Sequence, residues 1–510
     1  YSFLFSHDGI EMLDAIIGGL ERRGGYDRRL KEMRFYRSFL VGKWLAREVT
    51  GYVDTIRNAV LNSSVEWNGR DYPFYELDGL ASEQKDEADR HAVMMLKGGL
   101  QREVFNPIFA SREEHLFESV KRFYPSYLSF VSDMRHLDDL PGMIDAAGDF
   151  FDKTDSLYRR LMEAEAKRWS GGSGESMTRD DYLGLFSFPG TESRFPAKIM
   201  YPLIKELVTR MGFPQSRQKG DHKITIDDSL NPKKSSAPVA LGVSVPNDIR
   251  ISFRPQGGLR DYENLFHEIG HALHMAGTKV PEWIFRHLGD KTATESYAGI
   301  FGSLVTDPQF LEFYRDFVAG WNSSVSFEER VPVLTEAEMG RIVRLAALRD
   351  LYMVRRYNYA KVIFESARIG GAEEMLGRFG LNSCGVSKGA YALLFGKAYG
   401  MDMEEWEAER YLVEAEDDFY AADYARSFIV RPQLARKLRE EFGSSWFVDG
   451  EAGRWLRENF FSQGNYFTPA DLKERFDLDP NDYSEFERDL RWRLLAAERL
   501  EMGRGVPERP

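Results

Sequence analysis

One segment of the sequence combines residue types and a spacing that are typical of a metal centre. His267 and His271 stand four residues apart, and Glu268 directly follows the first histidine. On a helix, side chains four residues apart project from one face about a turn apart, so both imidazoles can bind one Zn²⁺. Glu268 lies beside that face, where it can reach a metal-bound water and act as a general base. The pattern therefore indicates metal-assisted hydrolysis.

Chance is a weak competing explanation for this string. With nine histidines in 510 residues, a His-Glu-x-x-His string arises by accident in roughly one chain in a hundred of this composition. The string sits on a helical pattern directly after the strand-rich part of the chain, which is the context that metallopeptidase sites use. The position of the string therefore favours a zinc centre.

A zinc centre of this kind needs a third protein ligand and leaves the fourth position to water. Metzincins are excluded, because they need Gly three and His six residues after the second histidine, whereas these positions hold His274 and Gly277. A glutamate from a following helix is the remaining possibility, and Glu295 is the preferred candidate. Its rivals are Glu282, close to the end of the first helix, and Glu312, expected at the surface.

The elements that must position these residues are a buried helix and a few short strands. Residues 261–275 form a helical pattern with enough apolar side chains to bury it. Segments 223–227, 239–245 and 248–254 are β-branched or alternating and predict strands. Helical patterns dominate elsewhere, and Thr468 before Pro469 predicts the start of a late helix. The sequence thus predicts a mostly α fold with a small β-sheet.

The residues around the histidines resemble a known family. The string Phe266–His274, preceded by Arg254-Pro255-x-Gly257-Gly258 and followed by Thr294-Glu295-Ser296, is similar to the thimet oligopeptidase and oligoendopeptidase F family of zinc metallopeptidases. The similarity covers about residues 237–302, and the spacing to Glu295 is closest to the oligoendopeptidase F branch. It implies a two-lobed zincin with a deep substrate channel, a small sheet beside the active-site helix pair, and short unstructured peptides as substrates.

The resemblance also implies roles for single residues. His267, His271 and Glu295 would bind one Zn²⁺ per chain, and Glu268 would be the general base. His274 matches the family string but is not expected to bind the metal. Members of the family usually carry another acid about two turns after the glutamate ligand, where this chain has Gly302. The group that orients a zinc-bound histidine is therefore not named by the sequence.

Two further segments have both a catalytic and an ordinary explanation. Tyr420 and Tyr424 loosely match the family's late tyrosines, which stabilise the oxyanion, but tyrosines four apart are also a common packing pair. Arg426 could hold a substrate carboxylate or lie at the surface in an ion pair. Residues 249–254 could offer a strand edge to an extended peptide, or could form a buried scaffold strand.

The length of 510 residues predicts more than one compact region. We expect an N-terminal helical lobe over residues 1–175, a catalytic region over 176–445, and a C-terminal helical segment over 446–510 packed on the catalytic region. The Gly/Ser-rich stretch 170–174 and a break near 443–445 suggest these boundaries.

Composition narrows the class of protein further. Lys and Arg number 68 against 81 Asp and Glu, a net charge of −13 that disfavours nucleic-acid binding. No apolar run approaches the roughly 18 residues of a membrane-spanning helix. The single cysteine, Cys384, favours the cytoplasm, although a signal peptide removed earlier would leave the same sequence. The oligomeric state stays open.

The function expected from these observations is hydrolysis of internal bonds in short peptides by a zinc metallopeptidase. A metallocarboxypeptidase or dipeptidyl carboxypeptidase on the same scaffold is the alternative within the same class. A catalytically inactive peptide-binding protein is the alternative outside it. Such a protein would be expected to lack a ligand or the base, and the four residues His267, Glu268, His271 and Glu295 are all present.

Overall fold

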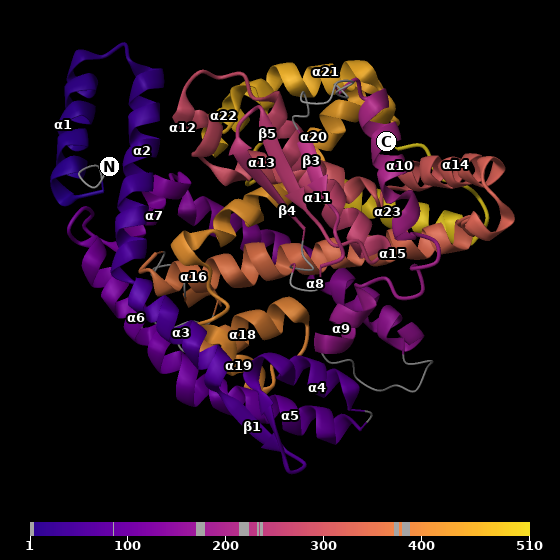
Figure 1. Ribbon diagram of the computed structural model, residues 1–510, viewed down its shortest axis with the longest axis horizontal. Coiled ribbons are helices and arrows are strands. Elements are labelled where there is room, and N and C mark those ends of the chain that lie inside the picture. Colours follow the sequence, from indigo (N-terminus) through magenta and orange to yellow (C-terminus); the bar gives the residue numbers. More distant parts are fainter. Residues whose placement is uncertain are drawn as a thin grey trace. The chain divides into compact units, whose positions relative to one another are not determined.

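The computed structural model describes residues 5–84, 86–169, 179–213, 224–231, 234, 238–371, 377–379 and 388–509. The chain is mostly helical with little strand, as Figure 1 shows, which confirms the predicted fold class at this level. Cys384 and the Gly/Ser-rich stretch 170–174 lie outside the described residues. Among the described helices, none combines the length and the apolar character needed to cross a membrane.

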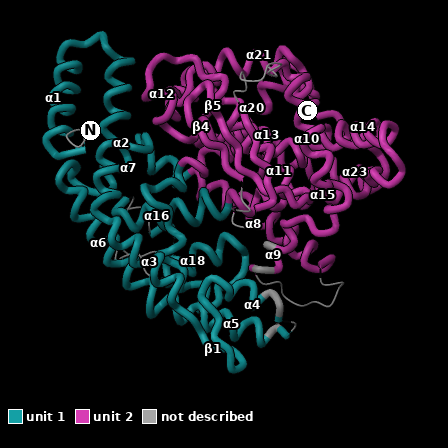
Figure 2. Tube along the Cα trace, in the orientation of Figure 1, with its two compact units in different colours: residues 1–145, 355–422 teal, residues 146–354, 423–510 magenta. Residues whose placement is uncertain are grey.

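The chain forms two compact units that are discontinuous in sequence (Figure 2). The first unit comprises residues 1–145 and 355–422, and the second comprises 146–354 and 423–510. The chain therefore passes from one unit to the other three times. The predicted segments 1–175, 176–445 and 446–510 are each one continuous stretch, whereas each of the two units combines two separate stretches of the chain.

The first unit is built from helices and one hairpin. Its buried cluster includes Leu77, Leu80 and Val93, against which Trp406 packs from a distant part of the chain. The hairpin is antiparallel, with Val65 opposite Tyr72. The elements are α1 (His7–Arg23), α2 (Asp27–Glu48), α3 (Thr50–Asn62), β1 (Ser64–Trp67), β2 (Arg70–Pro73), η1 (Phe74–Glu76), α4 (Leu77–Glu83), α5 (Glu87–Leu100), η2 (Gln101–Phe105), α6 (Asn106–Val120), α7 (Tyr127–Arg135), the start of α8 (Leu140–Trp169), η4 (Arg355–Lys361), α16 (Val362–Arg368), η5 (Gly377–Phe379), α18 (Lys388–Tyr399), α19 (Glu405–Ala408), η6 (Glu409–Tyr411) and η7 (Asp417–Phe419).

The second unit contains the sheet and the helix that carries the two histidines. Its helices are most of α8, α9 (Arg179–Leu185), α10 (Ala197–Arg210), α11 (Leu259–Gly277), α12 (Trp283–His287), α13 (Lys291–Leu304), α14 (Pro308–Ser324), η3 (Phe327–Glu329), α15 (Glu336–Val354), most of α20 (Ala421–Phe442), η8 (Trp446–Val448), α21 (Gly450–Asn459), η9 (Phe461–Gln463), α22 (Pro469–Phe476) and α23 (Ser484–Glu501). The predicted late helix is confirmed as α22, where Thr468 forms a capping box with Asp471.

The sheet of the second unit has three strands in the order β3 (Ile224–Asp227), β5 (Asp248–Ser252), β4 (Val239–Ser244). β5 pairs in parallel with β3 and antiparallel with β4. The hypothesis that residues 249–254 offer an edge to a substrate is therefore wrong, because a strand paired on both sides has no open edge. Ile249 and Ile251 are fully buried, as the scaffold explanation requires.

α11 and α13 pack closely because of a glycine between the two histidines. A Cβ atom at Gly270 would lie 2.7 Å from the backbone Cα of Ala298 and 3.1 Å from the carbonyl oxygen of Tyr297. Only glycine allows the two helix backbones to approach this closely without a shift. The α11–α13 contact therefore brings the face that carries His271 next to the first turns of α13.

The start of α11 is fixed by the Gly-rich turn that precedes it. Gly257 and Gly258 both have φ of +91°, a conformation that side-chain-bearing residues rarely adopt. Asp261 accepts hydrogen bonds from the amides of Gln256, at 2.6 Å, and Gly257, at 2.8 Å. This turn carries the chain from β5 into α11, the helix with the two histidines.

Candidate metal centre

Three side chains from α11 and α13 converge on one point. The Nε2 atoms of His267 and His271 lie 3.1 Å apart. Oε2 of Glu295 lies 3.5 Å from Nε2 of His267 and 3.7 Å from Nε2 of His271. Donors bound tetrahedrally to one zinc at about 2.0–2.1 Å stand about 3.3 Å from one another. The spacing of the three atoms therefore fits a single zinc ion.

The charge state of Glu295 also suits a metal ligand. Burial by itself would raise the pKa of this carboxyl, but hydrogen bonds and charge from His267 and His271 outweigh burial and hold the pKa well below its usual range. Glu295 is 6% exposed, whereas the imidazoles are half-buried. The site thus combines a buried anionic oxygen with two imidazoles that are partly exposed.

Glu268 is held beside this group by the edge strand. Its Oε2 accepts a hydrogen bond of 2.6 Å from the backbone amide of Ala240 in β4. Ala240 stands opposite Ile251 in the antiparallel register. The carboxylate next to the first histidine is therefore positioned by a backbone group of the sheet.

A chain of hydrogen bonds fixes the orientation of His271. Nδ1 of His271 lies 3.2 Å from Oγ1 of Thr294, which lies 3.3 Å from Nδ1 of His274. Nε2 of His274 lies 3.1 Å from the carbonyl oxygen of Gly464. Burial lowers the pKa of His274 to about 3, against the opposing effect of the Gly464 hydrogen bond, so this imidazole is neutral at pH 7.

The carbonyl of Gly464 determines the proton positions along this chain, because a carbonyl can only accept. His274 donates from Nε2 to Gly464, so its Nδ1 accepts from the Thr294 hydroxyl. Thr294 in turn accepts from the Nδ1 proton of His271. Nδ1 of His271 is thus committed to Thr294, and Nε2, which faces the other two donors, is the nitrogen available to a metal.

No model of a known protein family matches the chain, and no curated protein matches it either.

Removing the Thr294 hydroxyl is expected to weaken zinc binding. Thr294→Val keeps the side-chain shape but breaks the chain between His271 and His274, and loss of such an orienting partner typically costs about 10–100-fold in metal affinity. Competition with a chromogenic chelator measures the change. Thr294→Ser keeps a hydroxyl and is expected to bind zinc within a few-fold of the native protein. Native affinity in Thr294→Val would contradict the proton assignment.

Gly302 lies directly against the first histidine. A Cβ at this position would stand 3.2 Å from Cβ of His267 and 3.3 Å from the carbonyl oxygen of Glu263. Among the described residues, no side chain hydrogen bonds Nδ1 of His267. The polar contacts of this imidazole are made through Nε2, with His271 and Glu295.

One turn before His267, a buried ion pair anchors α11 to α15. Both carboxylate oxygens of Glu263 accept from Arg349, one of them at 2.7 Å. Next to Arg349, Asp350 accepts from Arg431 at 3.1 Å and from Arg493 at 2.9 Å. Sequence reasoning missed Glu263 and Thr294, although Glu263 stands four residues before His267 on the same helix face.

The rival ligands lie outside the cluster. In the part of the chain that the structure describes, the group that includes His267 contains neither Glu282 nor Glu312. Glu282 precedes the first turn of α12. Glu312 is half-buried in α14, where burial raises its pKa, so the expectation of an exposed side chain is wrong.

The two candidate tyrosines fall on different sides of a unit boundary. Tyr420 belongs to the first unit, where the guanidinium of Arg135 lies 4.9 Å from the centre of its ring. Tyr424 belongs to the second unit and is half-buried in α20, and its carbonyl accepts from Ser427 at 2.8 Å. Arg426 is buried. The role of either phenol in stabilising an oxyanion stays a prediction.

Proposed function

We propose that the protein is a zinc-dependent oligopeptidase that hydrolyses internal bonds of short, unstructured peptides. The observation that carries this proposal is the convergence of His267, His271 and Glu295, with Glu268 held beside them. Two nitrogens and one carboxylate oxygen are a common ligand set of catalytic zinc. The proposed scaffold is a two-lobed, thimet oligopeptidase-like zincin with a deep substrate channel.

Each residue of the proposed site has its own role in the hydrolysis. His267, His271 and Glu295 would hold the zinc ion, which would supply Lewis acidity toward a water molecule and the scissile carbonyl. Glu268 takes the proton from the attacking water and passes it to the leaving amine. Tyr420 or Tyr424 is the proposed hydrogen-bond donor to the oxyanion. The single cysteine of the chain favours a reducing compartment such as the cytoplasm for this activity.

The edge strand β4 is the proposed binding surface for the peptide backbone. β4 pairs only with β5 among the described strands, so its outer edge can take another strand, apart from the Ala240 amide that Glu268 occupies. The amide of Ala240 faces Glu268 from this edge, which places a paired peptide next to the general base. Pairing through main-chain hydrogen bonds binds extended peptides of many sequences.

The exposed face of β4 supplies an apolar contact. Val239, Leu241 and Val243 alternate along the strand and are 41%, 50% and 55% exposed. Ala240 and Gly242 stand opposite the buried Ile251 and Ile249, so the side chains of Val239 and Leu241 project from the other face of the sheet. Apolar side chains of a substrate are the natural partners of this surface.

Mass spectrometry of a defined peptide mixture tests the proposal. Peptides of about 6 to 30 residues are incubated with zinc-loaded protein and with protein stripped by a chelator. Internal cuts in the shorter peptides, present only with zinc, would support an oligopeptidase. Stepwise loss from the C-terminus would replace it by a carboxypeptidase. Intact peptides despite stoichiometric zinc would refute hydrolysis and favour an inactive peptide-binding protein.

A further inference from the structure

A group of buried ion pairs connects four helices of the second unit. It consists of Glu263 of α11, Arg349 and Asp350 of α15, Arg431 of α20 and Arg493 of α23, and we call it the charge network. Arg349 donates to both carboxylate oxygens of Glu263, and Asp350 accepts from Arg431 and Arg493. The five side chains are between 6% and 15% exposed, so water screens their charges weakly.

Two members of the network lie one helical turn from a proposed metal ligand. Glu263 stands four residues before His267 and on the same face of α11. Arg431 lies against Gly299 of α13, where an added Cβ would stand 3.0 Å from Cδ of the arginine. Gly299 stands four residues after Glu295. The network therefore contacts both of the helices that carry the ligands.

Stability alone does not account for this network. Burial by itself would raise the pKa of Asp350, but the charges of Arg431 and two further arginines outweigh burial and hold the pKa below its usual value. The carboxylate is therefore ionised at pH 7, and each buried charge has lost its hydration. Because of this loss, replacing a buried ion pair by apolar side chains of similar volume is often neutral or stabilising. What the pair of Arg349 and Glu263 adds is direction, since a guanidinium that binds both oxygens of a carboxylate fixes their relative orientation.

His267 is the ligand for which such a restraint matters most. His271 is oriented by its hydrogen bond to Thr294, whereas no side chain in the described part of the sequence bonds Nδ1 of His267. A rotation of α11 about its axis would move the His267 imidazole relative to Glu295 on α13. The pair of Glu263 and Arg349, one turn away, resists such a rotation.

We propose that the charge network positions the metal ligands. Arg349 fixes the rotation of α11 through Glu263, and Arg431 holds α13 at Gly299. The ligand atoms of the two helices thereby keep the spacing that one metal ion needs. Arg349 and Arg431 are positioning residues, because they act through the helices and not as ligands. The proposal rests on the proposed metal centre, but it does not depend on peptide hydrolysis.

Cobalt binding by the full chain tests this proposal without any peptide substrate. Co²⁺ binds to the same kinds of nitrogen and oxygen ligands as zinc, and its visible absorption changes with coordination geometry. Glu263→Leu together with Arg349→Met replaces one ion pair of the network by apolar side chains, and the melting temperature is expected to stay near the native value. Cobalt affinity, measured against a competing chelator, is expected to fall about tenfold, the lower end of the effect of orienting partners. The absorption spectrum of the bound cobalt is expected to change as well.

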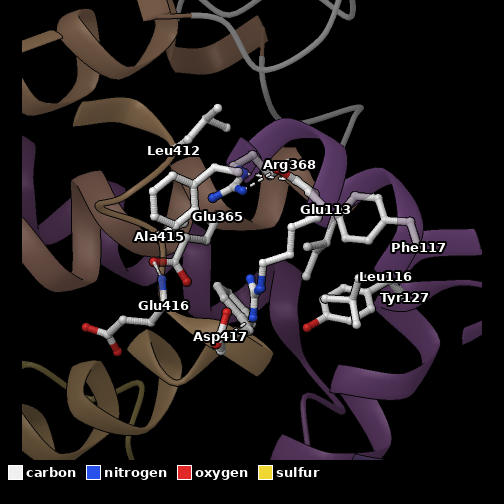
Figure 3. A pocket seen from close by; sticks show the side chains of 14 residues that line it. Glu113, Leu116, Phe117, Tyr127, Glu365, Arg368, Leu412, Ala415, Glu416 and Asp417 are labelled. Atoms are coloured by element: carbon white, nitrogen blue, oxygen red, sulfur yellow. Dashed lines mark hydrogen bonds and ion pairs between the residues drawn. The ribbon is translucent and has the colours of Figure 1, made fainter. Parts of the chain in front are cut away.

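Two buried ion pairs whose residues lie on neither α11 nor α13 serve as matched controls. Arg344, also on α15, donates to Glu165 of α8 at 2.6 Å, and the two side chains are 14% and 5% exposed, as in the network. In the first unit, Arg368 of α16 donates to Glu113 of α6 at 3.1 Å on the wall of a cavity, as Figure 3 shows. Glu165→Leu with Arg344→Met, and Glu113→Leu with Arg368→Met, are expected to bind cobalt with the native affinity and spectrum.

The comparison separates positioning from stability. The proposal would be overturned if the protein with Glu263→Leu and Arg349→Met melted near the native temperature and bound cobalt with the native affinity and spectrum. Equal losses of affinity in the control pairs would overturn it too. Arg349→Lys keeps the charge but not the contact with both oxygens, so its cobalt affinity is expected to lie between those of the native and the doubly substituted protein. If the doubly substituted protein does not fold, native cobalt binding in both Arg349→Lys and Arg431→Met would overturn the proposal.

The outcome of this test is distinct from the outcome for the proposed hydrolysis. A native protein that bound neither cobalt nor zinc would refute the metal centre and this proposal with it. A native protein that bound cobalt but cleaved no peptide would refute the hydrolytic function alone, because the effects of Glu263→Leu with Arg349→Met on cobalt binding are measured without a peptide.

Discussion

Glu268→Gln is expected to keep zinc bound and to lower the rate of peptide hydrolysis by about 10²–10⁴-fold. The amide has the shape of the carboxylate but cannot take a proton from the attacking water. Its carbonyl oxygen can still accept from the Ala240 amide, which holds Glu268 at 2.6 Å in the native protein. The substitution therefore removes the base without moving its neighbours. Initial rates on one cleaved peptide and the zinc content of the purified protein measure both effects.

A matched substitution tests whether the loss of activity is specific to Glu268 or follows the loss of any carboxylate in the region. Glu282 precedes α12 and lies outside the ligand group, so Glu282→Gln is expected to hydrolyse the peptide at the native rate. A Glu268→Gln protein with near-native turnover would assign the proton transfer to another group. Loss of zinc from that variant would instead mean that the carboxylate supports metal binding.

The second large effect is expected at Glu295, the proposed third ligand. Glu295→Ala removes the buried anionic oxygen that lies 3.5 Å and 3.7 Å from the two imidazole nitrogens. Because a ligand is lost rather than an orienting partner, zinc affinity is expected to fall by more than the roughly 100-fold upper range for orienting partners. Equilibrium dialysis against a zinc buffer gives the affinity, and the peptide assay is expected to show no turnover at sub-saturating metal.

The order of the losses is as informative as their size. Zinc affinity is expected to decrease from native to Thr294→Val and then to Glu295→Ala. Glu312→Ala, an acid in the same unit outside the cluster, is expected to bind zinc as the native protein does. A Glu295→Ala protein that remained fully loaded at zinc concentrations near the native dissociation constant would contradict the ligand assignment.

The local part of the site could be predicted from the sequence because it depends on one helix. A spacing of four residues places His267 and His271 on one face wherever the helix lies. The role of Glu295 is harder to predict from the sequence, because the position of this side chain depends on how α13 packs against α11. Gly270 permits that packing, but its neighbour Ala298 could not be identified without the fold.

The orienting chain and the strand order depend on contacts between distant residues. The proton positions of Thr294 and His274 are set by the carbonyl of Gly464, 190 residues after His274, and no local pattern marks that residue. The alternation in residues 248–254 predicts a strand, which the structure confirms over residues 248–252 with Ile249 and Ile251 buried. It does not determine which strands pair with this strand, so the central position of β5 between β3 and β4 could not be predicted.

The interleaved course of the chain has a consequence for its synthesis. Residues 1–145 emerge from the ribosome first, but their unit is completed only when residues 355–422 follow. Trp406, for example, packs against Gly98, where an added Cβ would lie 2.7 Å from the tryptophan Cβ. The core around helices α1–α7 is therefore incomplete while residues 146–354 are translated. The core of the second unit is likewise incomplete until residues 423–510 have been translated. Such a chain completes both cores late, which lengthens the interval in which its apolar surfaces are open to chaperones or to aggregation.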